Sequence, residues 1–288
     1  MSRDSASSSL SSHGGETRNE SGKDLRWARF KAHLRLWQKW WLKPHKPFQP
    51  VFVIATWRSG SNLLLSYLNQ QPNISVLSEV LLSTLPIGPS RDCIPPHQAL
   101  RHIRYCLQGE KTGVRGCKLM LHQMSNCQFT LDDLHRQHPQ AKYIVLYRQS
   151  LAEQFVSHKM AQATSQYILA RGEQARRAEI VVNARELREY CDDIRGRYRD
   201  ALAHSWLPGR AVLLSYEELV DDPAHWLKEQ ICPLLGVNYV PLETRLMKQN
   251  TRPLSEQIVN YRDVEGLIES SVCQQQHGWP KQIDQRAA

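Results

Sequence analysis

The stretch that most constrains this chain is Val51–Leu65, VFVIATWRSGSNLLL, in which an apolar run passes through a short polar turn into an amphipathic run. The apolar part is typical of a buried strand and the amphipathic part of a helix. Gly60 allows the main chain of the turn to approach a ligand closely. Because backbone N–H groups and the helix dipole favour negative charge at the start of a helix, this arrangement predicts a binding site for an anion.

The side chains of the turn strengthen that prediction. Arg58 adds a positive charge, and Ser59 and Ser61 add hydroxyl donors. The turn is not a Walker A loop, because GxxxxGK[ST] is absent and no Lys precedes the hydroxyl residues. A nucleotide-dependent kinase with a P-loop-like site is the alternative function for such a loop, and the missing Lys disfavours it.

From Phe48 onward, short β-rich runs alternate with amphipathic stretches, a pattern typical of an α/β fold in which helices cover a sheet. Five strands are expected. They are Val51–Thr56, Ile74–Leu77, Val114–Met120, Tyr143–Tyr147 and Ala211–Ser215.

The intervening helices follow from apolar spacing and from capping residues. Ser61–Gln70 and Ser150–Ala163 each place their apolar side chains mostly on one side. A capping box at Thr130 predicts the start of a helix that ends before Pro139. Residues 166–205 are highly charged and carry no strand signal, so they predict one long helix.

A second basic position follows the strand Tyr143–Tyr147. Arg148 stands at its carboxyl end, and Ser157 lies on the next helix. Ligands of open α/β sheets bind at the carboxyl ends of the strands, so Arg148 and Ser157 are candidates for a second anion pocket. For this segment alone, an ordinary surface Arg and a helical Ser are the alternative.

The first 47 residues differ in composition from the rest. Residues 1–23 hold eight serines and three glycines and almost no large apolar side chains, so we expect a disordered tail. Of the net charge of +9, +6 lies in residues 24–46. Residues 24–47 predict a basic amphipathic helix. The side chains that share its apolar face are Trp27, Phe30, Leu34, Trp37 and Trp41.

This basic helix has two interpretations that the sequence leaves open. Its Trp-rich face suits an anionic membrane surface, or it packs on the following domain while the lysines stay in solvent. Nucleic acid is not expected as a partner, because no reader motif accompanies the charge. The helix also supports a rival function, a non-catalytic protein bound at a membrane surface.

Composition argues against several other classes of protein. The mean hydropathy is −0.52, no apolar run reaches 18 residues, and no apolar stretch precedes residue 25, which disfavours a membrane-spanning helix or a secretory signal. Seven cysteines without CxxC or Cys/His ligand spacing predict free thiols and no metal site. We expect a cytoplasmic protein, with peripheral contact at the inner face of the membrane through residues 24–46 as the alternative.

Five short motifs occur in the order TWRSGSN, PNISVLSE, VRGCKLM, LYRQSLAEQFVS and LSYEELVDDP. Together they resemble the sulfotransferases that use 3'-phosphoadenosine 5'-phosphosulfate (PAPS), and their wording is nearest to the bacterial carbohydrate branch, which includes nodulation-factor and trehalose sulfotransferases. The resemblance implies a P-loop-like three-layer sandwich over residues 48–288, with a central, mostly parallel sheet flanked by helices. It also implies transfer of a sulfuryl group from PAPS to a hydroxyl of a carbohydrate or glycolipid acceptor, without a metal.

The resemblance further implies which residues bind the donor. The loop that holds the 5'-phosphosulfate would consist of Arg58, Ser59, Gly60, Ser61 and Asn62. Arg58 would contact the oxygen that bridges phosphorus and sulfur. The 3'-phosphate would bind Arg148 and Ser157. The C-terminal stretch KQNTRPLSEQIVNY would add Lys248 and Arg252 as nucleotide contacts.

Sulfuryl transfer also needs a base for the acceptor hydroxyl and cations where charge builds up on the leaving group. Glu79 matches the position of the family's acidic base, and Lys118 is expected to assist at the sulfonate. His122 is the alternative base, because histidine titrates nearest neutrality. Tyr216 and Glu217, between a strand and a helix, are interpreted as architectural.

Two positions depart from the family's pattern. Asn62 stands where Thr or Ser is usual, and Trp57 stands where the bacterial branch often has Pro. Neither change removes a charge. Binding of PAPS is therefore still expected. The family resemblance does not specify the geometry of the loop.

Overall fold

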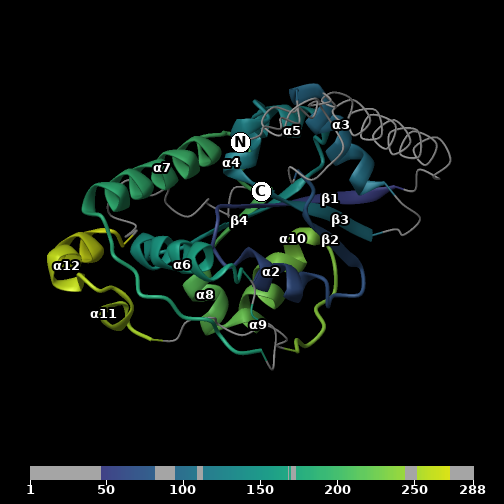
Figure 1. Ribbon diagram of the computed structural model, residues 1–288. Coiled ribbons are helices and arrows are strands. Elements are labelled where there is room, and N and C mark those ends of the chain that lie inside the picture. The colour runs from purple at the N-terminus through teal and green to yellow at the C-terminus, as the bar shows by residue number, and fades with distance from the viewer. Residues whose placement is uncertain are drawn as a thin grey trace, which may run out of the picture. The chain divides into compact units, whose positions relative to one another are not determined.

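A parallel sheet forms the centre of the fold in the computed structural model (Figure 1). The structure describes residues 47–81, 95–108, 113–167, 169, 173–243 and 252–272. Within these ranges the strands lie in the order β2-β3-β1-β4-β5, and every neighbouring pair runs parallel. The strands are β1 (Phe48–Ala55), β2 (Ile74–Glu79), β3 (Gly113–Met120), β4 (Lys142–Tyr147) and β5 (Ala211–Ser215).

All five predicted strands are confirmed, with ends that differ by no more than a few residues from those expected. The sheet is fully parallel, in line with the mostly parallel sheet that the motifs implied. In β1, every residue from Val51 to Ala55 is fully buried. Because both faces of the sheet are covered, this central strand is a continuous apolar run rather than an alternating one.

Helices cover both faces, which gives three layers. Figure 1 shows α3, α5 and α7 above the sheet and α2, α8 and α9 below it. The helices whose side chains join the first face are α3 (Pro96–Leu107), α4 (Leu121–Asn126), α5 (Leu131–Gln137), α6 (Leu151–Thr164), α7 (Ala184–Leu202) and α12 (Tyr261–Ser270). The second face carries α2 (Ser61–Leu68), α8 (Tyr216–Asp221), α9 (Pro223–His225), the π-helical η1 (Trp226–Ile231) and α10 (Cys232–Leu235).

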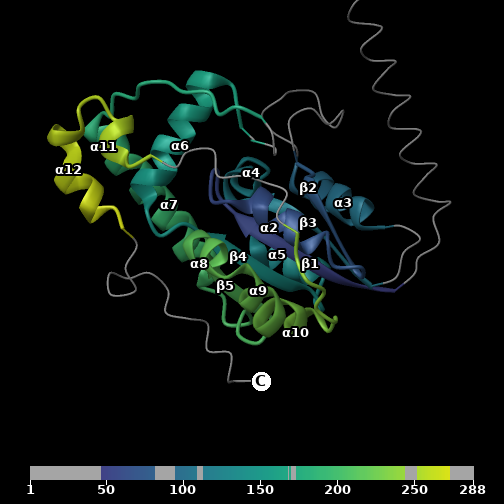
Figure 2. The ribbon, with the colours of Figure 1, turned by 90° about the horizontal axis from the view of Figure 1, so that it is seen from below.

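Side chains of the strands alternate between these two faces, as the pleat requires. In β1, Phe52 and Ile54 enter one hydrophobic cluster, whereas Val51 and Val53 enter the other. Viewed from below in Figure 2, α2 and α8 to α10 lie in front of the strands. Each face thus has its own core.

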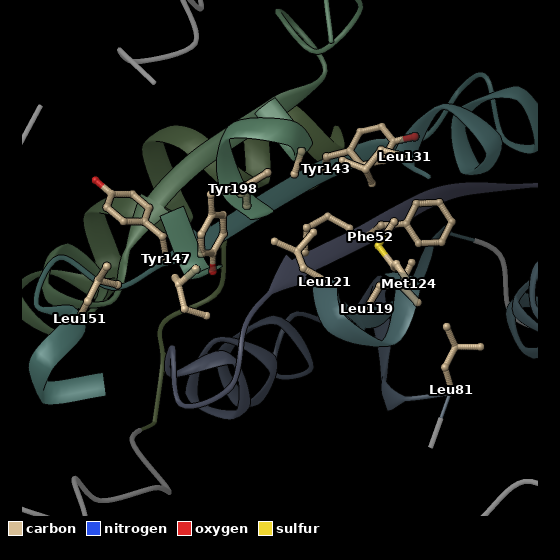
Figure 3. Close-up of a cluster of buried hydrophobic side chains, with 14 of the residues drawn as sticks. Phe52, Leu81, Leu119, Leu121, Met124, Leu131, Tyr143, Tyr147, Leu151 and Tyr198 are labelled. Atoms are coloured by element: carbon tan, nitrogen blue, oxygen red, sulfur yellow. The ribbon is translucent and has the colours of Figure 1, made fainter. Parts of the chain in front are cut away.

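Aromatic side chains fill much of the first core (Figure 3). The rings of Phe52 in β1 and Tyr143 in β4 lie 5.9 Å apart between centroids. Tyr198 of α7 is fully buried, and its hydroxyl donates to the carbonyl oxygen of Leu146 at 2.5 Å. The same hydroxyl lies 3.1 Å from Thr56 Oγ1, so α7 is joined to the carboxyl end of β1.

The predicted capping box at Thr130 is confirmed. Its side chain accepts from the N–H of Asp133 at 3.2 Å, and the Asp133 carboxylate accepts from the N–H of Thr130 at 2.8 Å. Ser150 caps α6 in the same way, accepting from the N–H of Glu153 at 3.2 Å. Both helices therefore begin where the sequence predicts.

The prediction of one long helix over residues 166–205 is wrong. Helix α7 begins only at Ala184, where Asn183 caps it by accepting from two backbone N–H groups. The described residues 173–183 before it are not helical, and Ile180 forms a parallel bridge with Ile258, close to α11 (Leu254–Gln257). The Ile180 N–H and carbonyl group bond to that C-terminal segment, which supplies hydrogen bonds that a helix would otherwise have to make.

Several predictions fall outside the described residues. They are the tail at 1–23, the basic helix at 24–47 except for its last residue, and Lys248. Within the described part of the chain, no helix has the length and apolar character needed to cross a membrane.

Candidate active site

The turn between β1 and α2 has the backbone that the anion-site prediction requires. Arg58 and Gly60 both have a left-handed conformation, with φ of 59° and 85°. A Cβ on Gly60 would lie 2.2 Å from the Tyr216 ring, so only glycine fits there. Helix α2 starts at Ser61 without a side-chain cap, which leaves its first N–H groups directed at the space in front of the turn.

A cavity of about 680 Å³ opens in front of this turn, at the carboxyl ends of β1, β3 and β4. Nine of the twelve predicted site residues line it. They are Arg58, Gly60, Ser61, Asn62, Glu79, Lys118, Arg148, Ser157 and Arg252. Most of the residues predicted from the family resemblance and from their positions at strand ends therefore lie around one cavity.

The remaining predicted residues do not line the cavity. Ser59 is fully buried, and its hydroxyl donates to the carbonyl oxygen of Thr56 at 2.9 Å, so it shapes the turn. His122 lies in α4 and is not one of the lining residues. Lys248 belongs to the stretch that the structure does not describe.

One side of the cavity holds an ion pair between a buried lysine and a half-buried glutamate. Lys118 is 2 % exposed, and its Nζ lies 3.0 Å from Glu79 Oε1. The two residues face each other across β2 and β3, where the register shifts by one residue. Glu79 is the last residue of β2. A cation and a carboxylate thus lie together at one edge of the sheet.

Two amides complete this group. Lys118 Nζ donates to Asn62 Oδ1 at 2.8 Å, and Gln123 Nε2 donates to Glu79 Oε2 at 2.9 Å. Asn62, the departure in the loop, thereby supplies an acceptor that orients Lys118. Gln123 of α4 was not predicted, and no signal in a single sequence points to it.

On the other side of the cavity, Arg148 is 7 % exposed. Its Nη2 lies 2.6 Å from Glu153 Oε2, and its Nε lies 3.7 Å from Glu217 Oε1. The Tyr216 ring covers the guanidinium at 4.7 Å. Tyr216 lines the cavity, so its interpretation as architectural is incomplete. Its place directly after β5, at a strand end, is the signal that could have indicated it.

Arg58 connects the two predicted anion pockets. Its Nε donates to Ser157 Oγ at 3.0 Å, and its Nη1 donates to the carbonyl oxygen of Tyr167 at 2.5 Å. Burial, and after it the nearby Arg148, lower the pKa of Arg58 from its ordinary value. Contacts of Arg58 therefore join the loop to Ser157 and Arg148.

An aromatic group borders the same cavity. Trp57 is 40 % exposed. Its ring is tilted by 37° against that of His122, with the centroids 3.8 Å apart, and stacks on that of His158, with the centroids 5.3 Å apart. Burial lowers the pKa of His122 to about 4 and, together with Arg58, lowers that of His158. Both imidazoles are therefore neutral near pH 7. Trp57 and His158 line the cavity and were not predicted as site residues.

Taken together, the lining suits a ligand with several negative charges and a hydroxyl that must lose a proton. Four Lys and Arg side chains, the uncapped helix start and hydroxyl groups can bind the negative charges, and Glu79 supplies a carboxylate. Among the described residues, no three His, Cys, Asp or Glu side chains gather so that they could hold a metal ion.

Comparison with known proteins gives a family match. The model described as "Sulfotransferase family" matches residues 92–241, which is 150 of the 288 residues. The match begins after the loop at 58–62 and includes Lys118, Arg148 and Ser157. A protein named Nodulation protein H, from Rhizobium tropici, is 24 % identical over 222 residues, which cover 74 % of this chain and 86 % of the relative.

Solved structures were also compared. A sulfotransferase from Alicyclobacillus acidocaldarius has a TM-score of 0.43 at 15 % identity, covering 78 % of this chain and 93 % of that one. A sulfotransferase from Mycobacterium tuberculosis has a TM-score of 0.42 at 13 % identity, covering 75 % and 73 %.

Proposed function

The chain belongs to the sulfotransferase family, and from this premise we propose that it transfers a sulfuryl group from PAPS to a hydroxyl of a carbohydrate or glycolipid. The observation that carries the proposal is the single cavity in which the loop after β1, Arg148 with Ser157, and Glu79 with Lys118 meet. This cavity offers basic groups for an anionic nucleotide and a carboxylate for an acceptor hydroxyl.

The residues fit the donor. The uncapped start of α2 and Arg58 suit the 5'-phosphosulfate, and Gly60 leaves the main chain open to it. Arg148 and Ser157 suit the 3'-phosphate, because a guanidinium and a hydroxyl can both donate hydrogen bonds to it. Both lie beside Arg58: Ser157 Oγ accepts from Arg58 Nε, and Arg148 Nη1 donates to the Arg58 carbonyl oxygen. When bound, PAPS supplies the sulfuryl group and a phosphate leaving group.

Glu79 is proposed as the general base. Its carboxylate lines the cavity, and Lys118 and Gln123 each contact one of its oxygens. A carboxylate oxygen has two lone pairs, so each oxygen keeps an acceptor site for the acceptor hydroxyl. Lys118 lies where it can stabilise charge on the sulfonate, and Arg58 where it can stabilise charge on the leaving phosphate.

His122, the alternative base, is disfavoured. Its ring packs against Trp57 outside the cavity lining, and a pKa of about 4 makes it a weak base. We propose that it supports Trp57 rather than removing a proton.

The carbohydrate acceptor is supported by two observations. The motifs of the chain resemble the bacterial carbohydrate branch, and Nodulation protein H matches 74 % of the chain. Trp57 provides a partly exposed aromatic side chain in the cavity that Glu79 and Lys118 also line, and aromatic rings pack well against apolar surfaces such as the apolar faces of sugars.

The first test is isothermal titration of the whole chain with 3'-phosphoadenosine 5'-phosphate, with adenosine 5'-phosphate as the control that lacks the 3'-phosphate. We expect binding that depends on the 3'-phosphate and that Arg148→Ala weakens at least tenfold, since a charged hydrogen bond contributes about 1.5–3 kcal/mol. Folded protein that does not distinguish the two nucleotides would overturn the proposal. ATP with Mg²⁺ tests the kinase alternative.

A further inference from the structure

The guanidinium of Arg148 is surrounded by protein groups. Nη2 contacts Glu153 at 2.6 Å, Nη1 donates to the Arg58 carbonyl oxygen at 3.4 Å, and Nε lies 3.7 Å from Glu217. The ring of Tyr216 covers its plane at 4.7 Å. Two carboxylates thus already balance the charge of Arg148, and a phosphate that approaches the guanidinium competes with them for it.

The two carboxylates differ in how firmly they are held. Glu217 accepts from the N–H of Gln149 at 2.9 Å and does not line the cavity. Glu153 lies in the first turn of α6, lines the cavity and is 41 % exposed. Glu153 is therefore the carboxylate that an anion entering the cavity reaches and can displace.

The environment of Arg148 explains why a carboxylate should lie there in the absence of nucleotide. Arg148 is almost fully buried, and a second cation, Arg58, is close enough to act on it electrostatically. A buried charge without a partner is strongly destabilising. A carboxylate at the cavity edge relieves that cost when no phosphate is present.

We propose that Glu153 is an internal competitor for the 3'-phosphate, which occupies the cavity-facing edge of Arg148 and thereby sets the affinity and the release rate of the nucleotide. This inference rests on the proposed function. A phosphate monoester carries more charge than a carboxylate and can accept two parallel bonds from a guanidinium, so it displaces Glu153. After transfer, the return of Glu153 to Arg148 favours release of the nucleotide product.

The test is titration of the full chain with 3'-phosphoadenosine 5'-phosphate and with adenosine 5'-phosphate, for wild type and Glu153→Gln. We expect Glu153→Gln to bind the 3'-phosphorylated nucleotide about two- to fivefold more tightly, since a partly exposed ion pair of this size is lost as a competitor. Stopped-flow measurement should show the gain mainly as slower dissociation. Binding of adenosine 5'-phosphate should not change.

Two further variants distinguish the effect of the negative charge from that of the contact between Glu153 and Arg148. Glu153→Asp keeps the negative charge in the first turn of α6 but is one methylene shorter, and we expect it to tighten binding as well. Glu186→Gln removes the same charge from an ion pair with Lys159 of α6, away from Arg148, and should leave both affinities unchanged.

Equal or weaker binding of the 3'-phosphorylated nucleotide by Glu153→Gln would overturn the inference, because Glu153 would then support Arg148. Equal tightening toward both nucleotides would also overturn it, as an effect of net charge. If wild type prefers the 3'-phosphorylated nucleotide but the variants do not differ from it, only this inference fails. If wild type has no such preference, the proposed function fails with it.

Discussion

At the scale of single residues, the candidate site depends on side chains that contact one another rather than on isolated chemical groups. Glu79 and Lys118 were both predicted, but their pairing at 3.0 Å follows from the register of β2 and β3. The same contact that neutralises Lys118 holds the carboxylate at the cavity edge. Substituting either residue should therefore affect the other.

Glu79→Gln should separate binding from turnover. The amide keeps nearly the same shape but cannot accept a proton, so we expect kcat to fall by about 100- to 10,000-fold. The affinity for 3'-phosphoadenosine 5'-phosphate, measured by titration, should stay within a few-fold. Turnover is measured as nucleotide release with an acceptor found by screening oligosaccharides and glycolipids.

The matched control is His122→Gln. Because its imidazole packs on Trp57 and does not line the cavity, we expect kcat to remain within about tenfold of wild type, well short of the loss of a general base. If His122→Gln abolishes turnover and Glu79→Gln does not, the assignment of the base is reversed.

At the scale of elements, local sequence signals placed the strands, the turn and several helix starts, because each depends on few neighbours. Ser150 and the capping box at Thr130 each satisfy a backbone N–H of their own helix. The prediction of one long helix over 166–205 was wrong because the conformation of this segment depends on residues that are distant in the sequence. Its first part makes backbone bonds with Gln257 and Val259, far along the chain.

Two Gly→Ala substitutions test where the backbone conformation requires glycine. Gly196 lies inside α7 with nothing within 4 Å of its would-be Cβ, so Gly196→Ala should raise the free energy of unfolding by about 0.5–1 kcal/mol. Gly60→Ala should instead lower it by about 1–3 kcal/mol, because the methyl group meets Tyr216 at positive φ. Urea denaturation of the whole chain measures both changes. Equal effects of the two substitutions would contradict this account of the turn.

At the scale of the whole molecule, burial gives several histidines a common behaviour. It lowers the pKa of His122 and His138 to about 4, and it lowers those of His102 and His158 in the same direction. In the unfolded chain a histidine titrates near 6.5. The unfolded state therefore binds more protons than the folded state between about pH 6.5 and 4.

Stability should consequently fall as pH is lowered through this window. The histidine contribution is fully present above about pH 6.5 and is lost progressively toward pH 4. Thermal or urea unfolding at several pH values measures the slope. His138→Gln should reduce that slope by up to about one proton, because the half-buried imidazole has its Nε2 buried without a hydrogen-bond partner among the described residues. A slope that is unchanged in His138→Gln would assign the pH dependence to other groups.

The sequence by itself determined the parallel sheet, the loop at 58–62, the capped helix starts and the residue types of an anion site. These depend on hydrophobic periodicity, on conformational limits of single residues and on motifs that the family shares. It could not show that Arg58 meets Ser157, that Asn62 orients Lys118, or that Glu153 and Tyr216 enclose Arg148. Those contacts join residues from different elements, and only the packing of helices on the sheet brings them within hydrogen-bonding distance.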